Sequence, residues 1–238
     1  MNTRSRTTPA TAAPAPAPES PWSTPAQRAQ QRQRKHEAVL QAAARLFNEK
    51  GFHATSLDDI AQQLHVTKPT LYYYVRSKDD ILLECVRTAL GLMQREIQAV
   101  RKAGGRAPDQ LVACMRVYAL IVTQEFGKCV IRIGEDPLPA PLRKELRRLK
   151  AGIDLEFRRL LQECIREGAI VDCDPKLAAF VLAGALSWIG RWYREDGELT
   201  PEQIADQAIG LLLNGVLKRP DPPQAPPVAS GARKKRAP

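Results

Sequence analysis

The sequence predicts an all-α protein with a small N-terminal helix-turn-helix domain and a larger C-terminal helical domain. Three observations support this prediction. Apolar residues recur at helical spacing in most segments between residues 27 and 217. No segment alternates apolar and polar residues as a half-buried strand does. Two short helical patterns around a tight turn occupy residues 55–78, and a longer helical pattern follows them.

The charge of the chain is concentrated at its two ends. The chain has 238 residues, enough for one or two domains with a full core, and a formal net charge of +10. Residues 1–36 contain six basic residues and one acidic residue, and so do residues 218–238, so each end carries +5 and the remainder is neutral. Basic ends attract any polyanion, and the high isoelectric point by itself is weak evidence for DNA binding.

The cysteines indicate a reduced environment. Cys85, Cys114, Cys129, Cys164 and Cys173 are dispersed through helical patterns without a C-x-x-C pair. They are expected to be thiols packed as small apolar residues, and a redox or metal role is the less favoured alternative. The N-terminus has no apolar signal-peptide core, and the longest apolar run, residues 177–190, is shorter than the ~20 residues of a membrane span. A cytoplasmic protein without a membrane partner is expected.

The first elements are an arm and an amphipathic helix. Residues 1–26 are rich in Pro and Ala and are expected to be disordered. A helix is predicted from Ala26 to Lys50, because Val39, Ala42, Ala43, Leu46 and Phe47 form one apolar stripe and Gly51 can end it.

The helix-turn-helix pattern runs from Thr55 to Lys78. Thr55 and Ser56 are good N-cap residues for a first helix with Leu57, Ile60, Ala61 and Leu64 on one face. After the turn Leu64-His65-Val66, Thr67 is the expected cap of a second helix with Pro69 in its first turn. Leu71 and Val75 are expected to point inward, and Lys68, Thr70, Tyr72 and Tyr73 outward. A structural helical hairpin is the alternative, and the polar and aromatic outer face favours DNA reading.

These residues resemble a known family. The run V-T-K-P-T-L-Y-Y-Y-V-R-S-K (66–78) resembles the recognition-helix signature of tetracycline-repressor-type (TetR-like) regulators, and Gly51-Phe52, Thr55-Ser56 and Ile60-Ala61 match the preceding part. The resemblance extends from about Arg34 to Leu82. One residue departs from it: His65 stands in the turn where the family usually has Gly, and a histidine can adopt a positive φ there at some cost.

The remaining elements are all predicted to be helical. Ser77 to Asp80 caps a long helix that ends at Gly104-Gly105, the connecting helix of the family. Helices are predicted at about 108–126, 142–168, 175–195 and 201–217, with a broken segment at 127–141. A tail from Pro220, with a basic cluster at 233–236, is expected to be disordered. The predicted domains are residues 27–80 for DNA binding and 81–217 for effector binding and dimerisation.

The resemblance implies specific DNA contacts. The predicted contact residues are Ser56, Lys68, Pro69, Thr70, Tyr72, Tyr73 and Lys78. Lys68 can reach guanine in the major groove, Pro69 and Thr70 can contact a thymine methyl, and the tyrosines can bind phosphate or sugar. Lys78 is expected to neutralise a phosphate, and the basic start of the first helix is expected to lie near phosphates without reading bases.

The last two helices are the predicted dimer interface. Trp188 and Trp192 are large residues at i, i+4 on a helix surface that otherwise carries small residues. The final helix has a matching stripe of small and apolar residues. The stripes comprise Ala178, Ala179, Ala183, Gly184 and Ala185, and then Ile204, Ala208, Leu211, Leu212 and Gly215. Such stripes can be plain core, but the resemblance implies a homodimer through a four-helix bundle. A symmetric dimer requires a palindromic operator in double-stranded DNA.

The resemblance also implies a small-molecule effector that enters the helical body. The predicted pocket residues are Met93, Met115, Tyr118, Phe126, Phe157 and Trp188, each of which can equally be core. The segment 188–206 resembles regulators of fatty-acid or steroid breakdown that respond to acyl-CoA. A basic cluster, Arg143, Lys144, Arg147, Arg148 and Lys150, can either meet CoA phosphates or form a solvated helix face.

Other functional classes fit the sequence less well. The chain has no phosphate-binding glycine loop, no H-E-x-x-H, no G-x-S-x-G and three histidines, so no enzymatic activity, cofactor or metal is expected. A non-specific architectural DNA binder that uses the basic ends is the alternative function. It leaves the large neutral helical body without a role, so a ligand-responsive transcriptional regulator, most simply a repressor, is the preferred prediction.

Overall fold

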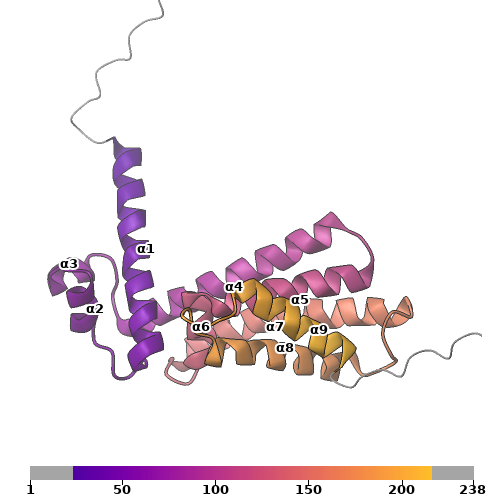
Figure 1. Cartoon of the computed structure of the whole chain (residues 1–238). Helices are drawn as coiled ribbons and strands as arrows, with labels where there is room; N and C mark the ends of the chain where they lie inside the picture. Colours follow the sequence, from indigo (N-terminus) through magenta and orange to yellow (C-terminus); the bar gives the residue numbers. More distant parts are fainter. Residues whose placement is uncertain (1–23, 216–238) are drawn as a thin grey trace, which may run out of the picture. The chain divides into compact units, whose positions relative to one another are not determined.

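The computed structural model describes residues 24–215 and is entirely helical in that range. The predicted N-terminal arm, up to residue 23, and the tail from 218 lie outside the described residues. Between 24 and 215 the chain forms nine helices and no strand, which confirms the all-α fold (Figure 1). It divides into two compact units between Glu84 and Cys85. The sequence placed this boundary between residues 80 and 81.

The first unit contains three helices and the start of a fourth. They are α1 (Pro25–Lys50), α2 (Leu57–Gln63), α3 (Lys68–Tyr72) and the beginning of α4 (Lys78–Ala103). Thr24 caps α1 in a capping box with Gln27, and Gly51 ends α1 with φ 86°. The predicted apolar stripe of α1 is buried, and Phe47, Ile60 and Leu71 are the large side chains at the centre of this unit.

The turn between α2 and α3 contains a left-handed residue at His65. His65 adopts φ 54°, a left-handed conformation that costs a non-glycine residue energy. Thr67 caps α3, as predicted. Helix α3 ends at Tyr72, although Leu71 and Val75 are both buried as predicted. After Tyr72 the chain continues in a turn, in which the amide groups of Tyr74 and Val75 both donate to the Leu71 carbonyl.

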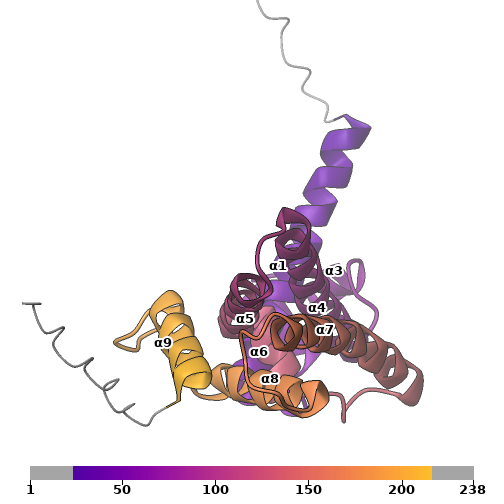
Figure 2. The same cartoon turned by 90° about the vertical axis from the view of Figure 1, so that its right-hand side faces the viewer.

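The second unit is built around one central helix. It contains the rest of α4, then α5 (Ala107–Thr123), α6 (Glu125–Arg132), α7 (Ala140–Arg166), α8 (Pro175–Trp192) and α9 (Pro201–Asn214). Helix α5 packs against α6, α7, α8 and α9, and α8 also packs against α6 and α7 (Figure 2). Asp174 and Thr200 cap α8 and α9 through their side chains. No helix in the described part is both long and apolar enough to span a membrane.

Helix α6 is the main difference from the sequence prediction. The segment 127–141 was predicted to be broken, but its first part is helical up to Arg132. Helix α5 stops at Thr123 because Gln124 is extended, and α6 begins at the next residue. A Cβ at Gly127 would lie 1.9 Å from the Ile121 carbonyl oxygen. Glycine therefore permits the close approach of α5 and α6, and does not break the helix here.

Candidate functional site

The outer face of α3 presents five of the predicted contact residues to solvent. Lys68, Pro69 and Thr70 are exposed, and Tyr72 and Tyr73 have exposed fractions of 50% and 64%. The helix is short, and its first turn is held by Thr67, whose Oγ1 accepts from the Thr70 amide at 3.4 Å and bonds the Thr70 hydroxyl at 2.8 Å. Buried Leu71 fixes the opposite face. The exposed row is therefore rigidly supported and free to meet a partner.

Lys68 and Ser56 have partners on α2. The Lys68 ammonium donates to Asp58 Oδ2 at 2.8 Å, and this bond raises the lysine pKa. Ser56 caps α2, and its hydroxyl and amide both donate to Asp59 Oδ2, which lowers the pKa of that carboxyl. Lys68 must leave Asp58 to reach a base, whereas the Ser56 amide and hydroxyl already serve the cap.

Lys78 is directed into the first unit. Its Nζ donates to the carbonyl oxygens of Phe52 at 2.8 Å, Thr55 at 2.9 Å and His53 at 3.4 Å. The ammonium also lies 4.5 Å from the centre of the Phe52 ring. Lys78 thus ties the loop after α1 to the start of α4. Its predicted phosphate contact has to compete with these bonds.

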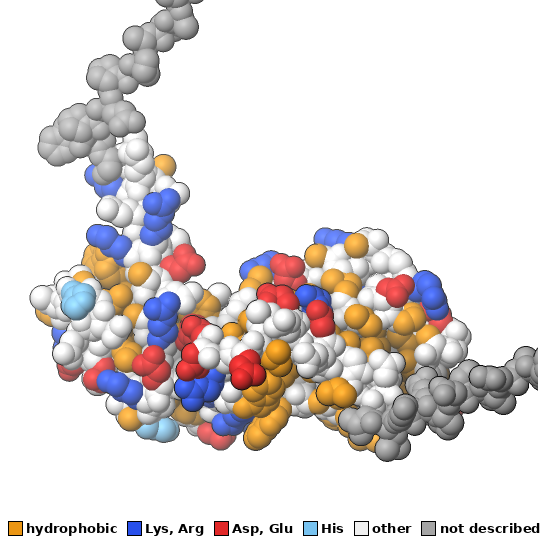
Figure 3. Space-filling view, viewed as in Figure 1, with side chains coloured by type: hydrophobic (Ala, Val, Ile, Leu, Met, Phe, Trp, Pro, Cys, Tyr) orange, Lys and Arg blue, Asp and Glu red, His pale blue; other side chains and the backbone are white. Residues whose placement is uncertain are grey.

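A basic surface along α1 adjoins the tyrosines. Arg28, Arg32 and His36 line an open hollow together with Tyr73 and Tyr74. The Arg32 guanidinium lies 5.0 Å from the centre of the Tyr73 ring. Lys and Arg side chains follow the length of α1 in the space-filling view (Figure 3). The basic start of this helix therefore shares a surface with Tyr73, as a polyanion-binding face requires.

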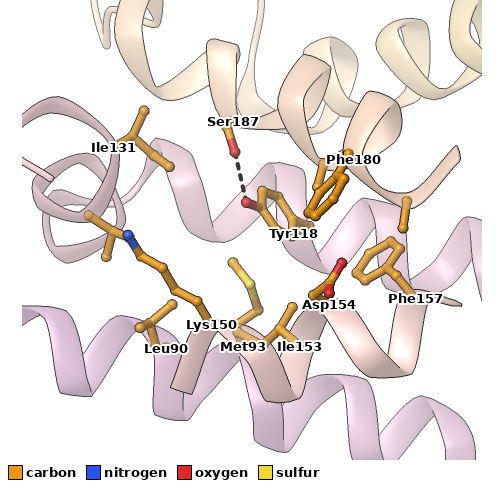
Figure 4. Close-up of a pocket in the computed structure, with 13 residues that line it drawn as sticks. Leu90, Met93, Tyr118, Ile131, Lys150, Ile153, Asp154, Phe157, Phe180 and Ser187 are labelled. Carbon is orange, nitrogen blue, oxygen red and sulfur yellow. Dashed lines mark hydrogen bonds between the residues drawn. The ribbon is translucent and has the colours of Figure 1, made fainter. Parts of the chain in front are cut away.

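The second unit contains a partly open cavity of about 240 Å³. Its thirteen lining residues come from α4 to α8 and are mostly apolar (Figure 4). Three predicted pocket residues, Met93, Tyr118 and Phe157, line it. Met115 is fully buried and does not line it, and neither does Phe126. Trp188 lies outside this cavity, in an open groove beside it.

Polar groups project into the apolar cavity at a few points. The Tyr118 hydroxyl and Ser187 Oγ are 2.7 Å apart, and burial raises the pKa of Tyr118, which keeps the phenol protonated. Lys150 and Asp154 lie one turn apart on α7, and Asp154 forms an ion pair with Arg158. Ser187 and Asp154 were missed by the sequence analysis, because a polar residue on an amphipathic helix does not reveal whether it faces a cavity.

The predicted basic cluster on α7 is dispersed. Arg147 pairs with Glu135 at 3.1 Å, and Lys144 and Arg148 are exposed on the helix surface. Lys150 alone among the five residues lines the cavity. Within residues 24–215, no group of three or more His, Cys, Asp or Glu side chains is arranged to hold a metal ion.

Two family models match the chain. "Bacterial regulatory proteins, tetR family" matches residues 39–85, from the second half of α1 to the start of α4. "Tetracyclin repressor-like, C-terminal domain" matches residues 104–216, which include α5 to α9. The chain belongs to the TetR family. It is therefore a DNA-binding transcriptional regulator by family, with its helix-turn-helix in the first unit and its cavity in the second.

Individual TetR-family relatives are similar over most of their length. The crystal structure of apo AibR is 30% identical, with a TM-score of 0.66 and coverage of 75% of this chain and 98% of that chain. A second AibR structure, in complex with isovaleryl coenzyme A and operator DNA, is 28% identical with a TM-score of 0.67 and the same coverage. The transcriptional repressor KstR2 of Rhodococcus jostii strain RHA1 is 26% identical over 188 residues, 75% of this chain and 89% of KstR2.

An apolar face of this TetR-family chain remains exposed on α8 and α9. Trp188 and Trp192, the two anchors predicted from the sequence, are 64% and 49% exposed. Hydrophobic side chains gather over α8 in Figure 3. Two residues of the predicted stripes, Ala179 and Ile204, instead face the core of their own unit. The exposed large apolar residues of the two helices are Leu177, Phe180, Val181, Trp188, Trp192, Leu211 and Leu213.

Proposed function

We propose that the protein is a transcriptional repressor that binds a palindromic operator as a homodimer and leaves it when a small effector binds. The observation that carries this proposal is the solvent-exposed face of α3, a helix capped by Thr67. The exposed residues of this face are Lys68, Pro69, Thr70, Tyr72 and Tyr73. A short helix with such a face fits the major groove.

The residues of this face have distinct proposed roles. Lys68 leaves Asp58 to donate to guanine, and Pro69 and Thr70 contact a thymine methyl. Tyr72 and Tyr73 bind phosphate or sugar, and Arg32 beside Tyr73 supports a backbone contact from α1. Ser56, the cap residue of α2, is proposed to contact the DNA at the start of that helix. The bonds of Lys78 to three carbonyl oxygens favour a supporting role for it over a direct phosphate contact.

Dimerisation is proposed through α8 and α9. Large apolar side chains exposed to water on a monomer are unfavourable, and pairing with its own copy would cover them. Six large apolar side chains support this assignment, including both tryptophans of α8, and Phe180 is left out because it lines the cavity. A two-fold dimer presents two copies of α3, which is why the operator is expected to be palindromic.

The effector is proposed to be an acyl-CoA that occupies the cavity of the second unit. The support is twofold: the cavity is apolar with few polar groups, and a relative has been crystallised with isovaleryl coenzyme A and operator DNA. Occupation of a cavity lined by α4 to α8 would shift these helices, and α4 continues into the DNA-binding unit.

The experiment is selection of bound fragments from a random DNA pool, repeated with a panel of acyl-CoA thioesters. A palindromic consensus is expected at physiological salt, and one group of thioesters is expected to abolish its recovery. Binding without sequence preference and with a steep salt dependence would instead identify an architectural DNA binder and overturn the proposal.

A further inference from the structure

The cavity of the second unit adjoins a second hollow on the same unit. This outer groove has a volume of about 500 Å³ and lies between the loop after α6, at Gly134 to Asp136, and one side of α8, with Trp188 and Arg191. Val130, Ile131, Lys150 and Ser187 line both the cavity and the groove. The two hollows therefore meet at these four side chains. The cavity is apolar, whereas the groove is open and bordered by charged residues.

We infer that the two hollows form one site for an acyl thioester, with the acyl group in the cavity, the thioester carbonyl at Tyr118 and Ser187, and the anionic carrier in the groove beside Lys150. This inference rests on the proposed function and assigns the parts of its effector site. It predicts that both halves of the ligand contribute to affinity.

The hydroxyl pair leaves one proton for a ligand. Tyr118 and Ser187 have two hydroxyl protons, and the bond between their oxygens uses one of them. The second proton has no acceptor among the hydrogen bonds of the described residues. Since the phenol is neutral, the pair can donate to an acceptor in the cavity. A carbonyl oxygen is such an acceptor, and a purely hydrocarbon ligand would leave the donor unsatisfied.

Lys150 supplies a cation where the cavity meets the groove. Its ammonium has no ion-pair or hydrogen-bond partner among the described residues, while nearby Asp154 is engaged by Arg158. In Figure 4 the Lys150 nitrogen lies on the side of Ile131, and Phe157 and Phe180 lie on the opposite side. An anion is therefore favoured at the Ile131 side and an apolar chain at the other. Arg191 places a second cation along the groove. The groove is also lined by two carboxylates, Asp136 and Glu135, of which Glu135 is paired with Arg147.

The cavity volume limits the acyl group. At about 30 Å³ per non-hydrogen atom, the volume of a water molecule in the liquid, the cavity of about 240 Å³ holds roughly eight atoms. Acyl groups of about six to eight carbons should fill it. Shorter chains leave a void, and longer chains require the helices to move.

The first test compares ligands on the full-length protein by isothermal titration calorimetry. Octanoyl-CoA is expected to bind at least tenfold more tightly than octanoate, than coenzyme A alone, and than butyryl-CoA or palmitoyl-CoA. Octanoate binding as tightly as octanoyl-CoA would show that the groove contributes nothing, and coenzyme A binding as tightly would show the same for the cavity. Either result overturns the inference.

The second test uses variants at the junction of cavity and groove, at Lys150 and Ser187, which line both, and at Tyr118, which is bonded to Ser187. Lys150→Gln should weaken octanoyl-CoA binding by about tenfold, the usual size of a charged hydrogen bond, and should reduce its salt dependence. Lys144→Gln, at an exposed position on the same helix, is the matched control and should bind like the wild type. Tyr118→Phe should weaken octanoyl-CoA binding by about threefold to tenfold. Unchanged affinity in both Lys150→Gln and Tyr118→Phe would contradict the inference.

Two further readouts separate this inference from the proposed function. Thermal unfolding of each variant without ligand verifies that the variant is folded. If Tyr118→Phe does not fold, Ser187→Ala takes its place in the binding test. Operator binding without ligand should be equal in all variants, because the junction residues lie in the second unit. If the wild type without ligand bound no operator, the proposed function would be wrong. If all variants bound the operator normally and octanoyl-CoA released them as it releases the wild type, only the inference about Tyr118, Lys150 and Ser187 would be wrong.

Discussion

Two lysines of the helix-turn-helix, Lys68 and Lys78, have different surroundings. Lys68 is exposed and has one carboxylate partner, Asp58, on the preceding helix. Lys78 is half-buried and donates to three carbonyl oxygens of the loop after α1. An exposed ion pair exchanges readily with a ligand, whereas a lysine with several backbone acceptors is held in place. The first is suited to reading DNA and the second to shaping the domain.

Replacement of Lys68 should change sequence preference. Lys68→Ala is expected to relax the base preference at one position of each operator half-site, at a cost of about 1–3 kcal/mol of discrimination. The measurement is fragment selection with each variant. Asp58→Asn is the control, since it frees Lys68 without removing it and should preserve the preference. Equal weakening on all sequences would make Lys68 a phosphate contact.

Replacement of Lys78 should change stability. Lys78→Met keeps the length of the side chain and removes the donors, and is expected to lower the free energy of unfolding by about 2 kcal/mol, as for hydrogen bonds to a charged group. The salt dependence of operator binding should stay the same. A salt slope smaller by about one with unchanged stability would instead establish the phosphate contact predicted from the sequence.

At the scale of elements, two ion pairs join α4 to α7. Arg87 pairs with Glu145 at the surface, and Arg101 forms a bidentate pair with Glu163 that is more buried. Arg101 also donates to Gln110, which in turn donates to the Gly105 carbonyl. This network fixes the turn between α4 and α5. It therefore holds the far end of the helix that continues into the first unit.

The Arg101–Glu163 pair should make stability depend on pH. The hydrogen bond with Arg101 lowers the pKa of Glu163 below its ordinary value of 4.5. The folded chain then binds fewer protons than the unfolded chain, so the contribution is complete above about pH 4.5 and is lost as the pH falls through the lowered pKa. Urea unfolding of Glu163→Gln should show a lower stability at pH 7 and a smaller loss on acidification.

The control for this prediction is an exposed carboxylate. Glu198→Gln, in the loop between α8 and α9, should leave both the stability at pH 7 and its acid dependence close to those of the wild type. If Glu163→Gln lost stability on acidification as steeply as the wild type, another carboxylate would dominate the pH dependence.

At the scale of the whole molecule, α8 and α9 expose large apolar side chains that nothing in the described part of one copy covers. Val181 is 57% exposed on α8, between Leu177 and Trp188. A charge placed at the centre of a paired apolar face would be buried without a partner, which is costly. In the proposed function the face and the operator are linked, because a two-fold dimer would offer two copies of α3 to one DNA duplex.

A charge on this face should separate the protomers. Val181→Glu is expected to sediment as a monomer and to lose operator affinity by at least a hundredfold, with unfolding of the monomer little changed. Leu155→Glu is the matched control, since Leu155 is 47% exposed and belongs to α7, not to α8 or α9. A wild type that sediments as a monomer, or a Val181→Glu variant that remains a dimer, would contradict the proposed interface.

Local chemistry explains which features could be predicted from the sequence. Helical periodicity, the caps at Ser56, Thr67 and Thr200, and the positive φ of His65 depend on residues within a few positions of one another. The exposed face of α3 could be predicted for the same reason. The family resemblance, read from residues 34–82, needed no tertiary contact either.

Contacts distant in sequence decided the rest. Gly127 looks like a helix breaker until the Ile121 carbonyl lies against it, and Lys78 looks like a surface cation until three carbonyl oxygens of another segment surround it. Met93 and Met115 follow the same periodic pattern, yet only Met93 borders the cavity. The helical spacing of apolar residues predicts which side chains face the interior of the protein. Whether it meets close packing or an open cavity depends on the helices opposite, which only the tertiary structure brings together.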